Sequence, residues 1–193
     1  MENLKEKHVD IVNGAKELFW KFGIKRVTIN EICEKADVSR GTFYKYFDNK
    51  DQLAIFIIQQ VVDETMKDYQ DIMELDIKYS EKMQKVVEMK LKGTDQMSKE
   101  FINDLYGEDF PELREFLEMK TKESLDLIIN DFREAQWNGN IRKDIKIEFI
   151  MYFMNKMREI IIDPQFENLY ENTQEMVNEL TKFFFYGIIE REE

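Results

Sequence analysis

The sequence predicts an all-α protein. Only 7 glycines and 2 prolines occur in 193 residues, so the chain has few residues that interrupt helices. Apolar residues recur at spacings of three and four, which gathers them on one face of a helix. Helix-start signals, each a capping side chain with a partner three positions later, recur near the N-terminus. These observations predict helices from one end of the chain to the other.

The first helix is expected from about Leu4 to Phe22. Its apolar stripe alternates spacings of four and three and consists of Ile11, Ala15, Leu18 and Phe22. Gly23 follows this stripe directly, and glycine is the usual residue just past a helix C-terminus. The first helix is therefore expected to end at that glycine.

Two short helices follow. Thr28 and Glu31 have the spacing of a capping box, which opens a helix with one apolar face made of Ile29, Ile32, Cys33 and Ala36. Ser39 can cap a second helix that begins at Arg40. Only two residues separate these helices, so they must cross steeply, as in a helix-turn-helix. Cys33 is expected to be ordinary core, although a reactive thiol is the alternative.

The rest of the chain continues as helices. Asn49 and Gln52 form a third capping signal, which opens a long helix that runs to about Met73. Further helices are expected over residues 80–91, 95–105, 111–138, 145–162 and 172–191. Gly139 and Pro164 punctuate the last part of the chain, each just past an expected helix.

Charge is distributed unevenly along the sequence. Residues 1–50 hold 10 basic and 8 acidic residues, whereas the remainder holds 18 basic and 32 acidic residues. An acidic body repels a polyanion, so any nucleic-acid contact is expected near the N-terminus. The stretch "SRGTFYKYFDNK", residues 39–50, is the basic and aromatic segment there.

The segment "AKELFWKFGIKRVTINEICEKADVSRGTFYKYFDNKDQL" resembles the N-terminal domain of the TetR family of bacterial transcriptional regulators over about residues 8–55. The shared features are an aromatic-glycine end of the first helix, a Val-Ser turn, the run Gly-Thr-Phe-Tyr and a Phe-x-x-Lys exit. Asp37 stands where the family often has glycine, and Tyr46 where many members have histidine. The resemblance implies a helix-turn-helix DNA-binding domain, residues 1–48, and a helical ligand-binding and dimerisation domain, residues 49–193.

The expected partner of the N-terminal domain is double-stranded DNA. Side chains of a recognition helix reach base edges and phosphates, and a glycine allows close approach to the groove. The predicted DNA-binding residues are Thr28, Ser39, Arg40, Gly41, Thr42, Tyr44, Lys45, Tyr46 and Lys50. The alternative is that the basic residues are solvated charges and that the tyrosines cover the core.

The last two long helices are expected to pair two copies of the chain. Both carry apolar residues on more than one face, so each needs more than one neighbour. The predicted interface of a homodimer consists of Phe149, Phe153, Met157, Ile160, Met176, Leu180, Phe183, Phe184 and Gly187. The alternative is that both helices are buried in their own subunit.

By resemblance, the acidic domain should bind an unidentified small molecule between its middle helices. Candidate lining residues are Phe101, Tyr106, Phe116, Met119 and Trp137, although each could instead be ordinary core. The resemblance implies a repressor that binds a palindromic operator as a dimer and is released by this ligand. A regulator controlled by a protein partner instead of a small ligand is the alternative.

An enzyme is not expected. His8 is the only histidine and is expected to be an exposed helix residue, and no phosphate-binding loop or nucleophile with a nearby base is visible. Neither a cofactor nor a metal is expected. The charged segment over residues 1–17 does not resemble a signal peptide, and no apolar run is long enough to span a membrane. One cysteine fits a reducing compartment, so a cytoplasmic location is expected.

Overall fold

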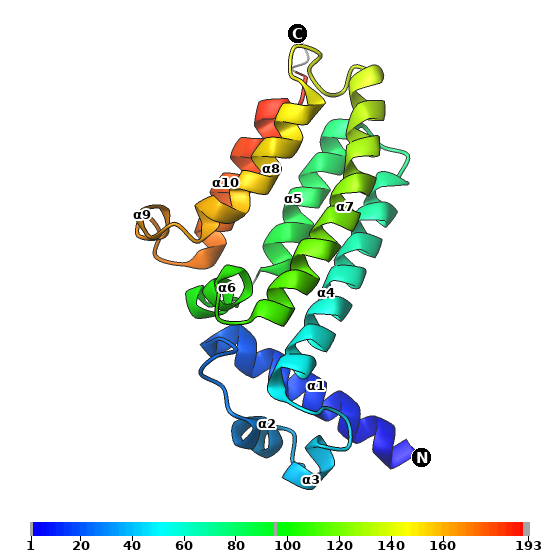
Figure 1. Cartoon of the computed structure of the whole chain (residues 1–193). Helices are drawn as coiled ribbons and strands as arrows, with labels where there is room; N and C mark the ends of the chain where they lie inside the picture. The colour runs from blue at the N-terminus through cyan, green and yellow to red at the C-terminus, as the bar shows by residue number, and fades with distance from the viewer. Residues whose placement is uncertain (1, 95, 191–193) are drawn as a thin grey trace. The chain divides into compact units, whose positions relative to one another are not determined.

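The computed structural model describes residues 2–94 and 96–190. Within those ranges it forms helices and no β-strand, which confirms the all-α prediction (Figure 1). The helices are α1 (Glu2–Phe22), α2 (Ile29–Lys35), α3 (Arg40–Phe43), α4 (Lys50–Met73), α5 (Tyr79–Gly93), α6 (Lys99–Tyr106), α7 (Pro111–Trp137), α8 (Ile147–Ile161), α9 (Pro164–Glu167) and α10 (Thr173–Ile188). None of these helices is both long enough and apolar enough to cross a membrane.

Helix ends agree with the sequence signals where the signal is local. Gly23 follows α1 with a positive φ of 81°, and Asn49 accepts a hydrogen bond from the backbone N–H of Gln52 at 2.8 Å, which caps α4. The start of α6 and the end of α10 differ from the expected helix boundaries. Ser98 caps α6, so this helix begins at Lys99; residue 95, where a start was expected, lies outside the described residues. The last helix ends at Ile188, and the expected end at residue 191 lies outside the described residues.

The chain divides into two compact units. The first comprises Met1–Asp63 and Gln96–Leu117, and the second comprises Glu64–Asp95 and Glu118–Glu193. The boundaries fall within α4 and α7, whereas the sequence suggested one boundary at residue 48. A sequence division follows chain order, but the packing of α6 against α1 adds a distant segment to the first unit.

The core of the first unit holds the short helices in place. Phe19 and Ile11 of α1, Ile32 of α2 and Phe43 of α3 are fully or almost fully buried together. Leu53 of α4 and Phe101 of α6 belong to the same core. Helices α2 and α3 are too short to be stable alone, so this shared core is what keeps them folded.

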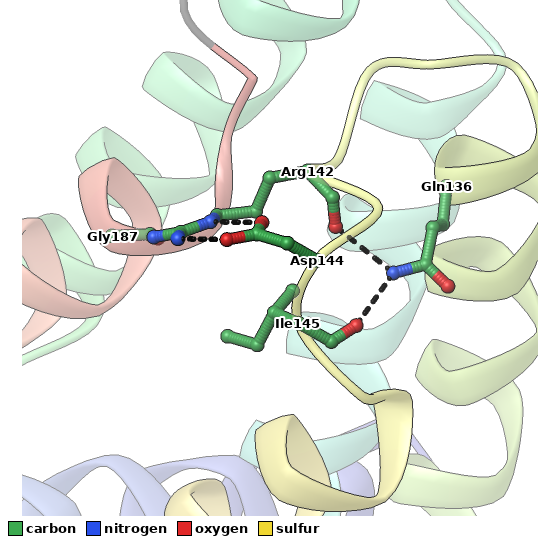
Figure 2. Close-up of polar contacts among 5 residues, drawn as sticks. All are labelled: Gln136, Arg142, Asp144, Ile145 and Gly187. Carbon is green, nitrogen blue, oxygen red and sulfur yellow. Dashed lines mark hydrogen bonds and ion pairs between the residues drawn. The ribbon is translucent and has the colours of Figure 1, made fainter.

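In the second unit, the loop that joins α7 to α8 is tied to the end of α10. The side-chain N–H of Gln136 donates to the carbonyl oxygens of Arg142 at 3.0 Å and Ile145 at 2.8 Å (Figure 2). Arg142 pairs with Asp144 and donates to the carbonyl oxygen of Gly187 at 3.3 Å. An isolated antiparallel bridge between Ile141 and Ile189 adds a backbone connection. These contacts fix the ends of α7, α8 and α10 relative to one another.

Candidate nucleic-acid interface

The turn between α2 and α3 is closed by backbone geometry. Asp37 adopts a positive φ of 50°, a left-handed conformation that aspartate tolerates better than most residues. The N–H of Val38 then donates to the carbonyl oxygen of Cys33 at 2.9 Å. The hydroxyl of Ser39 accepts a hydrogen bond from the N–H of Thr42 at 3.1 Å and caps α3. This cap stabilises the start of α3 by about 1 kcal/mol.

The segment that carries the predicted base-reading residues is a short helix followed by tight turns. Regular α-helix ends at Phe43, and the hydrogen bonds from Lys45 to Thr42 and from Tyr46 to Phe43 continue it as 3₁₀-like turns. Phe43 is fully buried and Phe47 almost so, which anchors the segment to the core. The exposed face therefore presents Arg40, Gly41, Tyr44 and Lys45 to solvent.

Arg40 and Tyr44 act as one polar and aromatic group on this face. The guanidinium of Arg40 lies over the ring of Tyr44, 5.9 Å from its centroid. It also donates a long hydrogen bond of 3.4 Å to the tyrosine hydroxyl. An exposed contact of this kind is weak, and both side chains are free to rearrange on binding.

Thr28 is engaged within its own helix. Its backbone N–H and its hydroxyl both donate to the carboxylate of Glu31 at 2.8 Å, and the N–H of Glu31 donates back to the hydroxyl at 3.2 Å. These hydrogen bonds hold the pKa of Glu31 below its usual range. The capping box predicted from sequence is confirmed, but it places a carboxylate where the predicted phosphate contact was expected.

Lys50 has a different environment from the one expected. Its ammonium donates to the carbonyl oxygens of Ile24 at 2.6 Å, Val27 at 2.8 Å and Lys25 at 3.1 Å. An ammonium group has three N–H donors, so all three are occupied. Burial also lowers the pKa of Lys50. The side chain holds the segment before α2 against the start of α4 and offers no spare donor to a phosphate.

Helix α6 supports the same segment, and no local sequence pattern indicates this contact. The carboxylate of Asp104 is buried and accepts the backbone N–H of Lys25 at 2.9 Å. The ammonium of Lys25 pairs with Asp109 at 2.8 Å. A Cβ at Gly23 would lie 2.7 Å from the Asp104 carboxylate, so only glycine fits both the backbone and the contact. The loop before α2 is therefore fixed from both α4 and α6.

The expectation that His8 is an exposed helix residue is wrong. It is half-buried, and its ring lies 5.4 Å from the ring of Tyr46, 5.4 Å from that of Phe47 and 5.2 Å from that of Phe56. The helical spacing of α1 could not reveal this contact, because the three rings come from residues 38 or more positions away. Tyr46, a predicted phosphate contact, is thus half-buried against the first helix.

The five residues predicted to line a ligand pocket divide between the two units. Phe101 is fully buried in the first unit, with its ring 4.3 Å from that of Trp20, and Tyr106 and Phe116 pack against the same core. Met119 and Trp137 belong to the second unit and are exposed. Trp137 is 85% exposed and does not enclose a cavity, so its own assignment is corrected, whereas the ligand site stays a prediction.

The residues predicted to form a dimer interface divide into three groups by their burial. Met176, Leu180 and Phe184 are buried within the single chain, because one face of α10 packs inside its own unit. These three therefore have no surface to offer a second copy. Phe153, Met157 and Ile160 are half-buried, and Phe149, Phe183 and Gly187 are exposed. Tyr152 and Tyr186, which were not among the predicted residues, are exposed large aromatics on the same two helices.

Comparison with known proteins agrees with this arrangement. Residues 11–55 match the model of the bacterial regulatory proteins of the tetR family. The TetC protein of transposon Tn10 from Escherichia coli is 46% identical over 52 residues, which are 27% of this chain and 26% of that protein. The first curated relatives are thus matched over about a quarter of their length.

Solved structures match over most of the chain at low identity, which shows the fold. A transcriptional regulator from Saccharomonospora viridis in complex with choline has a TM-score of 0.75 at 17% identity, covering 97% of this chain and 100% of that one. The transcriptional regulator FadR from Bacillus subtilis in complex with stearoyl-CoA has a TM-score of 0.69 at 19% identity, covering 94% and 99%. With its capped helix-turn-helix and this match, the segment over residues 11–55 is similar to the DNA-binding domain of the bacterial regulatory proteins of the tetR family.

Proposed function

We propose that this protein is a transcriptional regulator that binds double-stranded DNA through α3 and the turns after it. The observation that carries the proposal is the division of residues 40–47. Phe43 and Phe47 anchor the segment in the core, while Arg40, Tyr44 and Lys45 remain exposed on one face. Arginine and lysine are the side chains most used to contact guanine edges and phosphates. Gly41 carries no side chain that would hold this face away from a groove.

We further propose that two copies act together on a palindromic operator. One short segment reads only a few base pairs, so specificity requires a second reading head about one helical turn away, roughly 34 Å. The dimer would pair the exposed residues of α8 and α10, which are Phe149, Tyr152, Phe183, Tyr186 and Gly187 and are here called the aromatic face. These two helices pack against each other, and large exposed aromatics are typical of an interface core.

Gly187 supports a second copy as the occupant of the aromatic face. A Cβ at this position would meet no atom within 4 Å, so nothing in the chain itself requires glycine there. Glycine within a helix costs up to about 1 kcal/mol relative to alanine. Close approach of a helix from a second copy would explain why glycine occupies this position.

A small molecule bound in the second unit is the proposed inducer. The similarity to regulators solved with choline and with stearoyl-CoA supports ligand control, although the chemistry of those ligands differs widely. A ligand that binds better to the DNA-incompetent state shifts the population away from the operator. Because a dimer on an operator obstructs polymerase, we propose repression as the mode of action.

The test is genomic selection of DNA fragments by the purified protein and by a variant with Arg40, Tyr44 and Lys45 changed to alanine. Enrichment of one palindrome by the wild type and its loss in the variant are expected. A control with Lys85→Ala and Lys92→Ala removes the same two positive charges from exposed sites in the second unit and should keep the enrichment. Equal enrichment by all three proteins, or none by the wild type at low salt, would refute the proposal.

A protein partner in place of a small ligand is the second candidate. The aromatic face would equally suit another protein, because it is apolar and exposed. Measuring the oligomeric state distinguishes a second copy from a protein partner. A purified protein that stays monomeric at micromolar concentration, yet binds DNA when another protein is added, favours control by a protein partner.

A further inference from the structure

A cavity of about 370 Å³ lies within the second unit, where the C-terminal end of α4, the start of α5 and the last turns of α7 meet. The residues that give it chemical character are Met73, Lys78, Tyr79, Lys82, Asp131 and Glu134. Two carboxylates, two lysines and a tyrosine thus line a space large enough for a small molecule. No local sequence pattern indicates these residues, because they come from three separate segments.

One buried hydroxyl group that lines this cavity lacks a hydrogen-bond partner. The hydroxyl of Tyr79 finds no partner among the described residues. Buried polar groups are nearly always paired, and an orphaned one destabilises the folded chain. The hydroxyl of Tyr79 therefore indicates a site that is completed by something other than this chain.

Asp131 provides negative charge next to the hydroxyl of Tyr79 and to that of Tyr69 on α4. Burial raises the pKa of Tyr69 and of Tyr79, and the carboxylate of Asp131 raises both further, for Tyr69 also by a hydrogen bond from its hydroxyl. The ammonium of Lys82 donates to the carbonyl oxygen of Met73 at 2.7 Å and is thus directed at the backbone. Carboxylates with aromatic rings beside them attract cations through charge and through the ring faces.

We propose that this cavity binds a small organic cation, with its ammonium group opposite Asp131 and a polar group within reach of the Tyr79 hydroxyl. The inference rests on the proposed function, because it assigns this ligand as the inducer. A cation would add a positive charge beside Asp131, and a ligand oxygen or N–H would satisfy the orphaned hydroxyl of Tyr79.

The test is calorimetric titration of the full chain with four cations: tetramethylammonium, choline, benzylamine and putrescine. The neutral isostere of choline, 3,3-dimethylbutan-1-ol, has the same shape without the charge and serves as the ligand control. Binding of at least one cation, and none of the isostere, is expected. Failure of all four cations to bind below about 10 mM, or equal binding of choline and its isostere, would overturn the proposal.

Three variants locate the binding. Asp131→Asn should weaken the cation roughly tenfold or more, because a charge-assisted contact is lost. Asp126→Asn removes the same charge from an exposed position of the same helix and should leave the affinity unchanged. Tyr79→Phe should weaken binding while raising the melting temperature of the free protein by about 2–4 °C, since an orphaned hydroxyl is removed. A fall in melting temperature, or equal affinities of Asp131→Asn and Asp126→Asn, would contradict the assignment.

The effect on DNA separates this inference from the proposed function. A cation that binds at Asp131 should release the wild type from its enriched DNA fragment and leave Asp131→Asn bound. Retained operator binding without any cation binding refutes only the cavity assignment. Cation binding by a protein that enriches no DNA fragment refutes the proposed function, and a bound cation that leaves operator affinity unchanged refutes the inducer role.

Discussion

The ammonium of Lys50 donates a hydrogen bond to the carbonyl oxygen of Ile24 at 2.6 Å, across 26 positions of sequence. Two more of its hydrogen bonds reach carbonyl oxygens of the same loop, which leads directly into α2. One side chain therefore ties the start of α4 to the entry of the helix-turn-helix. We therefore expect Lys50 to position the segment proposed to bind DNA rather than to contact DNA itself.

Changing Lys50 to methionine is expected to destabilise the chain by roughly 1–3 kcal/mol, because three carbonyl groups, two of them in partly buried hydrogen bonds, lose their donor. Operator affinity should fall, but the slope of log K against log salt concentration should stay that of the wild type. Lys45→Ala provides the comparison: an exposed lysine that contacts a phosphate lowers the slope by about 1 when removed. A reduced slope for Lys50→Met would show that Lys50 contacts a phosphate after all.

Gly41→Ala is expected to leave stability unchanged or slightly improved and to weaken operator binding about tenfold. The added Cβ would meet nothing closer than the hydroxyl of Ser39, at 3.7 Å, so the free protein can accept it. Alanine is also the better helix former. The melting temperature checks the predicted stability, and a DNA-binding titration checks the predicted loss of operator affinity. Unchanged operator affinity would mean that the groove does not approach this part of α3.

Two adjacent phenylalanines on α10 should behave oppositely. Phe184→Ala, at a side chain only 5% exposed, should cost about 3–5 kcal/mol of folding stability. Phe183→Ala, at one that is 71% exposed, should change monomer stability by less than about 0.5 kcal/mol and weaken dimerisation tenfold or more. Analytical ultracentrifugation and urea unfolding measure the two effects. A Phe183→Ala variant that dimerises like the wild type would exclude the aromatic face as the interface.

The loop between α7 and α8 permits a comparison of two side chains in Figure 2. Gln136→Ala is expected to destabilise the chain by about 1–3 kcal/mol, because the carbonyl groups of Arg142 and Ile145 lose their donor. Arg142→Ala should have little effect, since its pair with Asp144 is exposed to solvent. Urea unfolding measures the loss of folding stability in both variants, and a larger loss for Arg142→Ala than for Gln136→Ala would contradict the prediction.

Tyrosine burial predicts a stability loss at high pH. The pKa of Tyr79 is raised above its ordinary value of 10.0 by burial and then by Asp131, so above pH 10 the unfolded chain ionises this hydroxyl while the folded chain keeps its proton. The folded state then binds more protons, and the free energy of unfolding falls as pH rises. The free energy of unfolding of Tyr79→Phe should fall less steeply than that of the wild type above about pH 10. Tyr152→Phe, at an exposed ring, serves as the control and should follow the wild type.

The sequence by itself determined the local features of this protein. The capping residues Thr28, Ser39 and Asn49, and Gly23 at the end of α1, were predicted and confirmed, because caps and stops depend on hydrogen bonds between residues two to four positions apart. The buried anchors Phe43 and Phe47 follow from the same helical spacing. These local signals were enough to predict the helix-turn-helix.

Only the tertiary structure decided which neighbour each side chain meets. Lys50 and Asp104 were indistinguishable in sequence from solvated charges, yet both hold the loop before α2, from helices far along the chain. Phe183 and Phe184 are identical in type, and packing against the rest of the second unit alone makes one buried and the other exposed. Burial depends on contacts between distant segments, and helical periodicity reports only which residues share a face, not what covers it.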